Sequence, residues 1–312
     1  MKTRLLTSAY LVIGLILAFV SRLLTPYIFD VVIGALAVVG TVEVGRVFER
    51  SKQYNNIYLV GSFPAVLFVG LVCAFTFNFA WQYYLLMVIG LMVLYFVVTF
   101  LLTLILRKQT AREMSKYQLE EKVGLYAFKK AINTSIILVY PALMFASLFV
   151  LNHLFGLSIS EKIVNAPFDY YLLLTVFCVT IVTDSLALVT GMTFKGPKLC
   201  PRVSPNKTIS GAIGGLAGGV AAAFAVYGLF TINAEFVKAF ESVASLWTVA
   251  ILGLVGSVIS QMGDLFASYL KRRARVKDYG TIFPGHGGVM DRVDGLIFNA
   301  SFVLIFALFL LK

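Results

Sequence analysis

Four aspartates and a run of Lys and Arg residues stand close together near the C-terminal end of the sequence. On a helix, Ser268 and Lys271 would share one face with Asp264, because residues three and four apart lie above one another. Asp291 and Asp294 are three apart and would likewise point two carboxylates in one direction. Carboxylates prefer hard ions such as Mg²⁺, whereas cations and hydroxyls bind phosphate oxygens. This set of side chains therefore suits a site for a divalent metal and phosphate groups.

A glycine-rich turn, PGHGG at residues 284–288, precedes the second pair of aspartates. Its backbone N–H groups would stand near the start of a helix, where phosphate binds readily. The simpler interpretation of His286 is a residue of a flexible turn rather than a catalytic base. In the same way, Asp264 suits the end of a membrane helix, where it would pair with Lys271 or Arg272.

A second polar segment, residues 190–215, follows an apolar run that contains Asp184. Its hydroxyls at Ser204 and Thr208 suit phosphate oxygens, and its prolines would hold nearby cations at fixed positions. These cations are Lys195, Lys198, Arg202 and Lys207. Two interpretations stay open, because short basic loops also set the topology of membrane proteins. We expect Asp184 to give polar support within the helix bundle.

The rest of the chain is apolar enough to be a polytopic membrane protein. Its 312 residues are 60% hydrophobic and only 13% charged, and a membrane helix needs about 20 apolar residues. We therefore predict an all-α fold of about nine transmembrane helices. The expected spans are residues 5–20, 27–42, 58–77, 83–106, 132–154, 170–190, 209–230, from 246 to beyond 261, and 296–311. They divide into an N-terminal transmembrane region of about five spans, residues 1–165, and a C-terminal catalytic region of about four spans, residues 166–312.

Three local features refine these helices. Pro141 would kink the fifth span, and the glycines of GAIGGLAGG, residues 211–219, would let helices approach closely. The long polar segment 107–130 would form one amphipathic surface helix. The apolar residues near one face of that helix are Met114, Tyr117, Leu125 and Phe128.

The distribution of charge predicts the orientation. With the N-terminus in the cytoplasm, the segments on that side hold 22 of the 26 Lys and Arg residues, as the positive-inside rule requires. Both motif segments then face the cytoplasm, where nucleotides are. The net charge of +11 follows from those loops and gives no reason to expect nucleic acid. Three distant cysteines and two histidines argue against a disulfide framework and against a zinc site.

Residues 268–294, SYLKRRARVKDYGTIFPGHGGVMDRVD, resemble the signature of the phosphatidate cytidylyltransferases, also called CDP-diacylglycerol synthases. The upstream sequence KLCPRVSPNKTISGAIGG, residues 198–215, is similar to the same family. The resemblance covers roughly residues 184–294, about a third of the chain, and its long composite pattern is specific. It implies an enzyme that joins CTP to phosphatidate, releasing pyrophosphate and leaving CDP-diacylglycerol in the membrane.

The resemblance also implies roles for individual residues and a Mg²⁺ cofactor, with a second cation beside it. The implied metal ligands are Asp264, Asp291 and Asp294. The implied catalytic residues are these three acids with Lys271 and Arg272. The implied substrate-binding residues are Ser204, Lys207, Thr208, Ser268, Lys277, His286, Gly287, Gly288 and Arg292.

The implied partners are CTP, phosphatidate and membrane lipid, and a homodimer is the assembly to test. We expect a multi-pass protein with its active site on the cytoplasmic side. Eukaryotic relatives tend to carry long polar N-terminal extensions, and this sequence shows none, so we expect a bacterial plasma membrane. Two alternatives stay open. One is a related CTP-dependent enzyme that acts on another lipid acceptor, such as an ether lipid or a polyprenol. The other is a membrane transporter with buried acids in its path, although no inverted repeat is evident.

Overall fold

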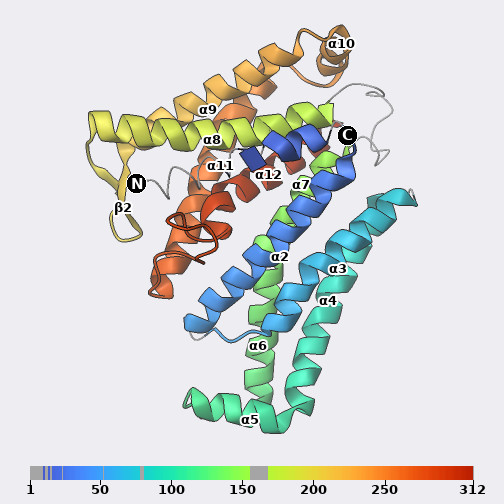
Figure 1. Cartoon of the computed structure of the whole chain (residues 1–312), viewed down its shortest axis with the longest axis vertical. Coiled ribbons are helices and arrows are strands. Elements are labelled where there is room, and N and C mark those ends of the chain that lie inside the picture. Colours follow the sequence, from blue (N-terminus) through green and yellow to red (C-terminus); the bar gives the residue numbers. More distant parts are fainter. Residues whose placement is uncertain are drawn as a thin grey trace.

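Among the residues that the structure describes, eight helical segments of the computed structural model are long and apolar enough to cross a membrane. The structure describes residues 10, 13–14, 16–22, 24–51, 53–77, 81–154 and 168–311. Within these ranges the chain folds into helices joined by loops and one two-stranded hairpin, so the predicted all-α polytopic class is confirmed (Figure 1). Each predicted span from the second onward falls on one of the eight segments. Half of the predicted first span, residues 5–20, lies outside the described residues, so the count of nine stays a prediction.

The described elements are long helices with short connections. The membrane-crossing segments are α2 (Pro26–Arg50), α3 (Ile57–Thr76), α4 (Trp81–Ile105), α6 to α7 (Val123–Asn152), α8 (Phe168–Phe194), α9 (Ile209–Phe230), α11 (Leu246–Arg273) and α12 (Met290–Leu311). The shorter elements are α5 (Arg107–Lys116), α10 (Ala234–Val243), β1 (Lys198–Cys200) and β2 (Ser204–Thr208). Side-chain N-caps define where two of these helices begin. Asn56 and Thr208 accept hydrogen bonds from backbone N–H groups in the first turns of α3 and α9.

Pro141 breaks the long segment that the sequence predicted as the fifth span. The helices α6 (Val123–Ile137) and α7 (Met144–Asn152) are joined by a wide turn, η1 (Leu138–Leu143), in which Tyr140 has a φ of −117° and a ψ of 113°. A proline has no N–H for the helix ladder and clashes with the preceding turn, so the helix bends there. The predicted kink is confirmed.

Two separate helices occupy most of the polar segment 107–130, where the sequence predicted one. Met114 of α5 is buried beside Tyr54, in the loop that follows α2. Leu125 and Phe128 belong instead to the start of α6 and are exposed. Because a turn separates the two helices, these apolar side chains do not share a face. The predicted single amphipathic helix is therefore wrong.

Helices α8, α9 and α11 pack so closely that larger side chains would not fit between them. A Cβ on Gly211 of α9 would lie 2.6 Å from the Ala187 carbonyl oxygen of α8, and one on Gly219 would overlap the Ser257 hydroxyl of α11. Small residues allow such an approach in lipid. The close packing predicted from residues 211–219 is confirmed, and Figure 1 shows α8 and α9 lying along one another.

Polar side chains inside the bundle bond to neighbouring helices. Asn299 of α12 donates from Nδ2 to the Val176 carbonyl oxygen (3.1 Å) and to Thr180 Oγ1 (3.0 Å), both on α8. Thr183 Oγ1, also on α8, donates to Ser257 Oγ of α11 over 3.0 Å. Away from water, such groups must be satisfied within the protein. These bonds therefore hold α8 in register with α11 and α12.

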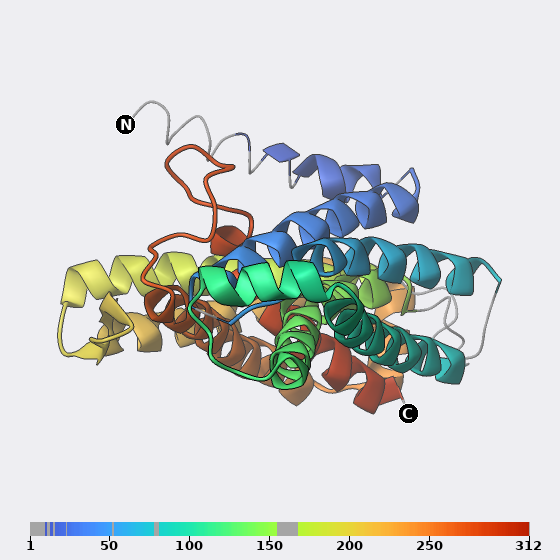
Figure 2. The same cartoon turned by 90° about the horizontal axis from the view of Figure 1, so that it is seen from below.

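Two polar clusters mark the opposite ends of α2. Near its start, Asp30 pairs with His153 Nε2 over 2.6 Å, and Arg22 pairs with Asp169. Toward its other end, Glu43 contacts the residues that open α12. Figure 2 shows the segment between α11 and α12 reaching across to α2. The segments predicted to face the cytoplasm thus meet at the Glu43 end of the bundle.

The predicted boundary between an N-terminal and a C-terminal region, after residue 165, lies among residues 155–167, outside the described residues. On either side of it the helices interlock, since α7 packs against both α8 and α12. The division into two regions stays a prediction.

Candidate functional site

The ends of α8, α9, α11 and α12, together with the β1–β2 hairpin, surround a cavity of about 1010 Å³. The acids that line it are Asp184, Asp264, Asp278, Asp291 and Asp294. The cations that line it are Lys195, Lys198, Lys207, Lys271 and Arg292. The fold thus brings both motif segments of the sequence to one space. A cavity with charges of both signs suits ligands that carry several phosphates.

Asp264 joins the two motif segments through an ion pair. Its Oδ2 lies 2.5 Å from Lys207 Nζ of β2, and its Oδ1 accepts a hydrogen bond from Ser268 Oγ over 3.3 Å. Because the cation comes from the hairpin, the alternative that Asp264 only pairs with Lys271 or Arg272 of its own helix is wrong. The side chains of the pair are 26% and 31% exposed, so a ligand in the cavity can reach both.

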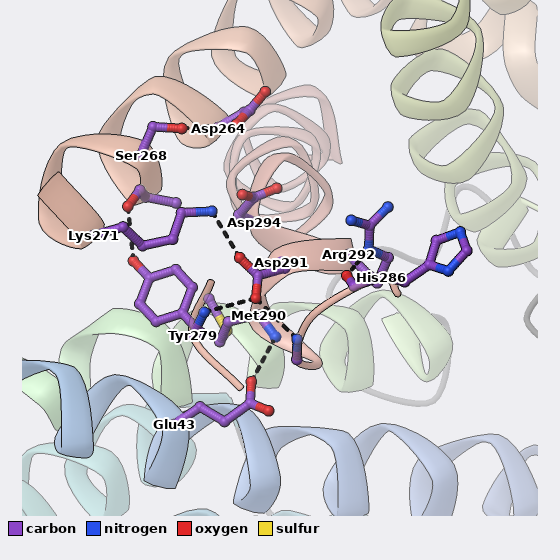
Figure 3. A network of polar contacts seen from close by, with 12 residues as sticks. Glu43, Asp264, Ser268, Lys271, Tyr279, His286, Met290, Asp291, Arg292 and Asp294 are labelled. Carbon is purple, nitrogen blue, oxygen red and sulfur yellow. Dashed lines mark hydrogen bonds and ion pairs between the residues drawn. The ribbon is translucent and has the colours of Figure 1, made fainter. Parts of the chain in front are cut away.

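Both carboxylate oxygens of Asp291 are bound by the protein (Figure 3). Oδ1 lies 2.7 Å from Lys271 Nζ of α11, and Oδ2 accepts the N–H groups of Tyr279 (2.7 Å) and Gly288 (2.9 Å). The Lys271 and Asp291 side chains are 11% and 3% exposed. A carboxylate withdrawn from water in this way needs such partners. The contacts tie the segment between α11 and α12 into a closed unit.

Asp294 lies one turn beyond Asp291 on α12 and also lines the cavity. It is 9% exposed, and the Gly295 N–H donates to its Oδ1 over 2.8 Å. Asp264 and Asp294 therefore offer carboxylates to one cavity from two helices, which fits a hard cation. Among the described residues, no three His, Cys, Asp or Glu side chains form a ready-made metal cluster. Asp264 and Asp291 are both bound by protein groups on each oxygen, but Asp264 is 31% exposed whereas Asp291 is 3% exposed. Asp294 and the more accessible Asp264 thus fit a metal ion better than Asp291 does.

The PGHGG turn and the residues after it give their N–H groups to protein carboxylates. Gly288 donates to Asp291, and Val289 and Met290 donate to Glu43 Oε1 (3.1 Å) and Oε2 (3.0 Å). Glu43 comes from α2 and is 3% exposed. The sequence predicted that the amides of this turn would bind phosphate. Gly288, the last residue of the turn, is instead bound by Asp291, and the two amides that follow it are bound by Glu43. The first N–H groups of α12 have no partner within the helix and therefore take these carboxylates.

His286 stands apart from the carboxylates. In Figure 3 its ring points away from Asp291 and Asp294, and its carbonyl oxygen accepts a hydrogen bond from Arg292 Nε over 2.9 Å. Its own N–H donates to the Phe283 carbonyl oxygen over 2.9 Å, which closes the turn. The structure therefore favours a turn residue over a catalytic base, while Arg292 itself lines the cavity.

Half of the predicted site residues line the cavity. Those that line it are Lys207, Thr208, Asp264, Lys271, Asp291, Arg292 and Asp294. Within the described part of the chain, those that do not are Ser204, Ser268, Arg272, Lys277, His286, Gly287 and Gly288. Arg272 follows Lys271 and is turned about 100° from it on the helix, so it points outward and donates to the Val203 carbonyl oxygen over 3.3 Å. Ser204 pairs with Cys200 in the hairpin.

Tyr279 packs the α11–α12 segment onto α11. Its hydroxyl donates to the Ala267 carbonyl oxygen over 3.1 Å, and Lys271 Nζ lies 5.2 Å from the centre of its ring. Burial raises the pKa of the Tyr279 hydroxyl, and the charges of Asp294 and Asp291 raise it further. The residue therefore remains a neutral hydrogen-bond donor.

Sequence reasoning missed Glu43 and Tyr279 and gave Asp184 only a supporting role. Asp184 is exposed to the cavity from α8. For Glu43, the available signal was an acid next to an apolar run, since an ionisable residue at membrane depth is a functional candidate by default. Tyr279 gave no signal, because its contacts depend on how the segment folds back onto α11.

Comparison with known proteins shows the family of this chain. A model of the cytidylyltransferase family matches residues 2–310. Relatives named phosphatidate cytidylyltransferase include one from Brucella abortus biovar 1, 42% identical over 151 residues, and one from Rickettsia felis, 39% identical over 140 residues. These matches cover 48% and 44% of this chain and 52% and 58% of the relatives, so the chain spans about half the length of the curated relatives it matches. Because the family model covers nearly all of its residues, the chain belongs to the cytidylyltransferase family.

Proposed function

We propose that the protein transfers the cytidylyl group of CTP to phosphatidate, forming CDP-diacylglycerol and pyrophosphate for phospholipid synthesis. The observation that carries this proposal is the shared cavity, where Lys207, Lys271 and Arg292 stand among carboxylates at the ends of four membrane helices. Two polyanions can meet only where cations offset their charge. The name of the relatives, phosphatidate cytidylyltransferase, supports the same activity.

One side of the cavity is apolar and suits a lipid substrate. Leu188 and Met192 of α8 line it and are 62% and 61% exposed, as expected for a helix surface that faces lipid. The headgroup of a membrane lipid would then enter sideways along α8, while its acyl chains stay in the bilayer. The nucleotide would enter from the water-filled side, past the β1–β2 hairpin.

In the proposed reaction, a phosphate oxygen of phosphatidate attacks the α-phosphorus of CTP. The new bond joins this oxygen to the α-phosphorus, and the bond from the α-phosphorus to the oxygen that bridges to the β-phosphorus breaks. Pyrophosphate leaves with the electron pair of that bond. A phosphate monoester is already largely dianionic near neutral pH, so the attacking oxygen needs no general base. The outward direction of the His286 ring is consistent with such a reaction.

The cations of the cavity have separate tasks in this proposal. Lys207 and Lys271 would bind oxygens of the triphosphate and of the leaving pyrophosphate, and Arg292 would bind a further phosphate oxygen. Each lysine is already held in place by an aspartate, so little reorganisation is needed when phosphate arrives. The roles predicted for Arg272 and Lys277 depend on side chains outside the cavity and are not part of this proposal.

Mg²⁺ suits the acids of the cavity. Asp264 and Asp294 would hold it, and when bound it would neutralise charge on the reacting phosphates. Asp264 would bind it when Lys207 turns from Oδ2 to a phosphate oxygen, and Asp291 would join them only if Lys271 likewise released Oδ1. A second cation beside it is part of the proposal, since Asp184 adds another carboxylate to the same cavity.

We propose further that the cavity faces the cytoplasm of a bacterial plasma membrane. The loops that border it are rich in Lys and Arg, as cytoplasmic loops are, and nucleotides are on that side. The matched relatives are bacterial proteins. A homodimer stays a prediction, for which crosslinking in intact membranes is the measurement.

The test supplies the purified full-length protein with Mg²⁺, phosphatidate and CTP labelled in its cytidine. We expect a labelled lipid product that requires both substrates, with release of pyrophosphate. Parallel reactions with an ether-lipid phosphate and with a polyprenol as acceptor test the alternative of a related CTP-dependent enzyme. Product from one of these acceptors and none from phosphatidate would overturn the proposed substrate. No labelled lipid from any acceptor would overturn the enzymatic proposal.

A further inference from the structure

Glu43 of α2 binds the two N–H groups at the start of α12, although 246 residues separate it from Val289. The distances are 3.1 Å from Val289 N to Oε1 and 3.0 Å from Met290 N to Oε2. The first N–H groups of a helix have no partner within the helix, and the helix dipole attracts a negative charge to them. Glu43 is 3% exposed, and a carboxylate so far from water persists only where it is paired. The contact is therefore specific.

Two glycines make room for Glu43. A Cβ on Gly288 would overlap both oxygens of the Glu43 carboxylate, and a Cβ on Gly280 would overlap Oε1. The three atoms that a Cβ on Gly288 would meet first all belong to Glu43. Neither glycine is among the described residues that line the cavity. The two glycines thus serve an acid of the N-terminal region rather than the substrates.

A continuous series of contacts leads from Glu43 to the cavity (Figure 3). Met290, which Glu43 binds, is followed by Asp291, and Asp291 in turn binds Lys271 Nζ over 2.7 Å. Asp294 lies one turn further along the same helix. Because one helix carries both aspartates, a shift of its first turn would move both carboxylates and release the contact with Lys271.

We infer that Glu43 is a positioning residue for the cytidylyl transfer. It holds the first turn of α12 at the place where Asp291, Asp294 and Lys271 face the substrates, and it acts through backbone N–H groups without lining the cavity. The inference rests on the proposed function for its catalytic consequence, whereas the contact itself does not depend on it. A misplacement of about 1 Å in a catalytic group can cost about 10²-fold in rate.

The first test replaces Glu43 with Gln in the full-length protein. The amide keeps the size of the side chain but turns one acceptor into a donor that faces backbone N–H groups. We expect kcat to fall by about tenfold to a hundredfold, with smaller changes in the KM values, because Lys207 and the hairpin still bind the nucleotide. Hydrogen exchange of the Val289 and Met290 amides should become faster. Glu49→Gln, on the same helix and outside the cavity, is the matched control and should change neither quantity.

Each outcome of this test has a distinct meaning. A wild-type kcat in Glu43→Gln together with faster exchange would overturn the positioning role. Unchanged exchange at Val289 and Met290 would overturn the contact itself. A wild-type protein that transfers no cytidylyl group would overturn the proposed function, and the exchange data would still decide whether the contact exists.

A second test retains the carboxylate, in case Glu43→Gln fails to fold. Gly288→Ala places a Cβ against Glu43 and should lower kcat by a similar factor. Adding Glu43→Asp shortens the acid by one methylene and makes room for the Cβ. The double variant should then be more active than Gly288→Ala alone by about threefold or more, because the two sites are coupled. If the losses in kcat from the two substitutions simply add in the double variant, Gly288 does not make room for Glu43.

Discussion

Lys207 of the β1–β2 hairpin and Asp264 of α11 form an ion pair of 2.5 Å that closes one side of the cavity. The strands of the hairpin are short, and an isolated two-stranded hairpin is marginally stable at best. Its position therefore depends on contacts with its surroundings. Arg272 adds a second link by donating to the Val203 carbonyl oxygen over 3.3 Å. One acid of α11 thus orients a cation from a separate motif segment.

Replacing Asp264 with Asn removes the partner of Lys207 and a proposed metal ligand. We expect CTP-dependent transfer to fall by about 10²-fold or more, because a proposed ligand of the metal that offsets phosphate charge is lost and Lys207 loses the group that orients it. The thermal midpoint should change little, since a pair that is 26% and 31% exposed contributes about 1 kcal/mol or less. Activity and thermal unfolding of the purified variant measure the two effects. Glu241→Gln, on the exposed surface of α10, should alter neither. Near-normal transfer by Asp264→Asn would contradict the metal assignment.

The buried pair of Lys271 and Asp291 predicts a cost in stability. In Lys271→Met, Asp291 keeps the N–H groups of Tyr279 and Gly288 but loses its cation. Breaking a buried pair on one side costs about 3–5 kcal/mol in the free energy of unfolding, and the two remaining N–H groups place this variant near the lower value. Lys271→Met with Asp291→Asn should be more stable than the sum of the single effects, because no lone charge remains. Strictly additive losses in thermal unfolding would show that the two charges do not interact.

The glycines of α9 predict a difference between two similar substitutions. Gly219→Ala would place a Cβ against Ser257 and Thr183, so the three packed helices must separate. Overpacking of this kind costs about 1–3 kcal/mol in the free energy of unfolding. Gly228→Ala, on the same helix, meets nothing within 4 Å and should be neutral or slightly stabilising. Equal thermal midpoints for the two variants would mean that α8, α9 and α11 are not in the contact described.

The proposed orientation predicts which positions a membrane-impermeant maleimide reaches. Lys277 is exposed in the α11–α12 segment and Glu235 is exposed on α10, at the other end of α11. In a background in which Cys73, Cys178 and Cys200 are replaced by Ser, we expect Glu235→Cys to react in intact cells with a permeable outer membrane. Lys277→Cys should react only in inverted vesicles. The opposite pattern would reverse the proposed orientation.

Much of the scaffold follows from the sequence because hydrophobicity and helical period are local properties. The apolar runs gave α8, α9, α11 and α12, and the spacing of Asp291 and Asp294 correctly predicted that both face one direction. The glycine series predicted a close approach of helices, since only small residues permit it. These expectations needed no knowledge of distant contacts.

The partners of the charged residues could not be predicted in the same way. Asp264 is followed by three cations on its own helix, yet it pairs with Lys207 of the hairpin. Glu43 binds amides more than two hundred residues away. Nearly every residue has a backbone N–H, so the sequence does not show which of them binds a distant acid. Lys271 and Arg272 carry the same charge, but successive helical residues point in different directions, and only Lys271 lines the cavity. Charge and spacing give the candidates, whereas the choice among them depends on the fold.

The pairing of Lys207 and Lys271 with aspartates has a consequence for the protein without bound ions. Because Lys207 offsets Asp264 and Lys271 offsets Asp291, the acids at the ends of these helices come together with their repulsion already reduced. Sites whose ligands are assembled only by an ion unfold when a chelator removes it. In this protein, chelation would stop the proposed transfer while the helices stay in place. The loss would then be fully reversible when Mg²⁺ is returned.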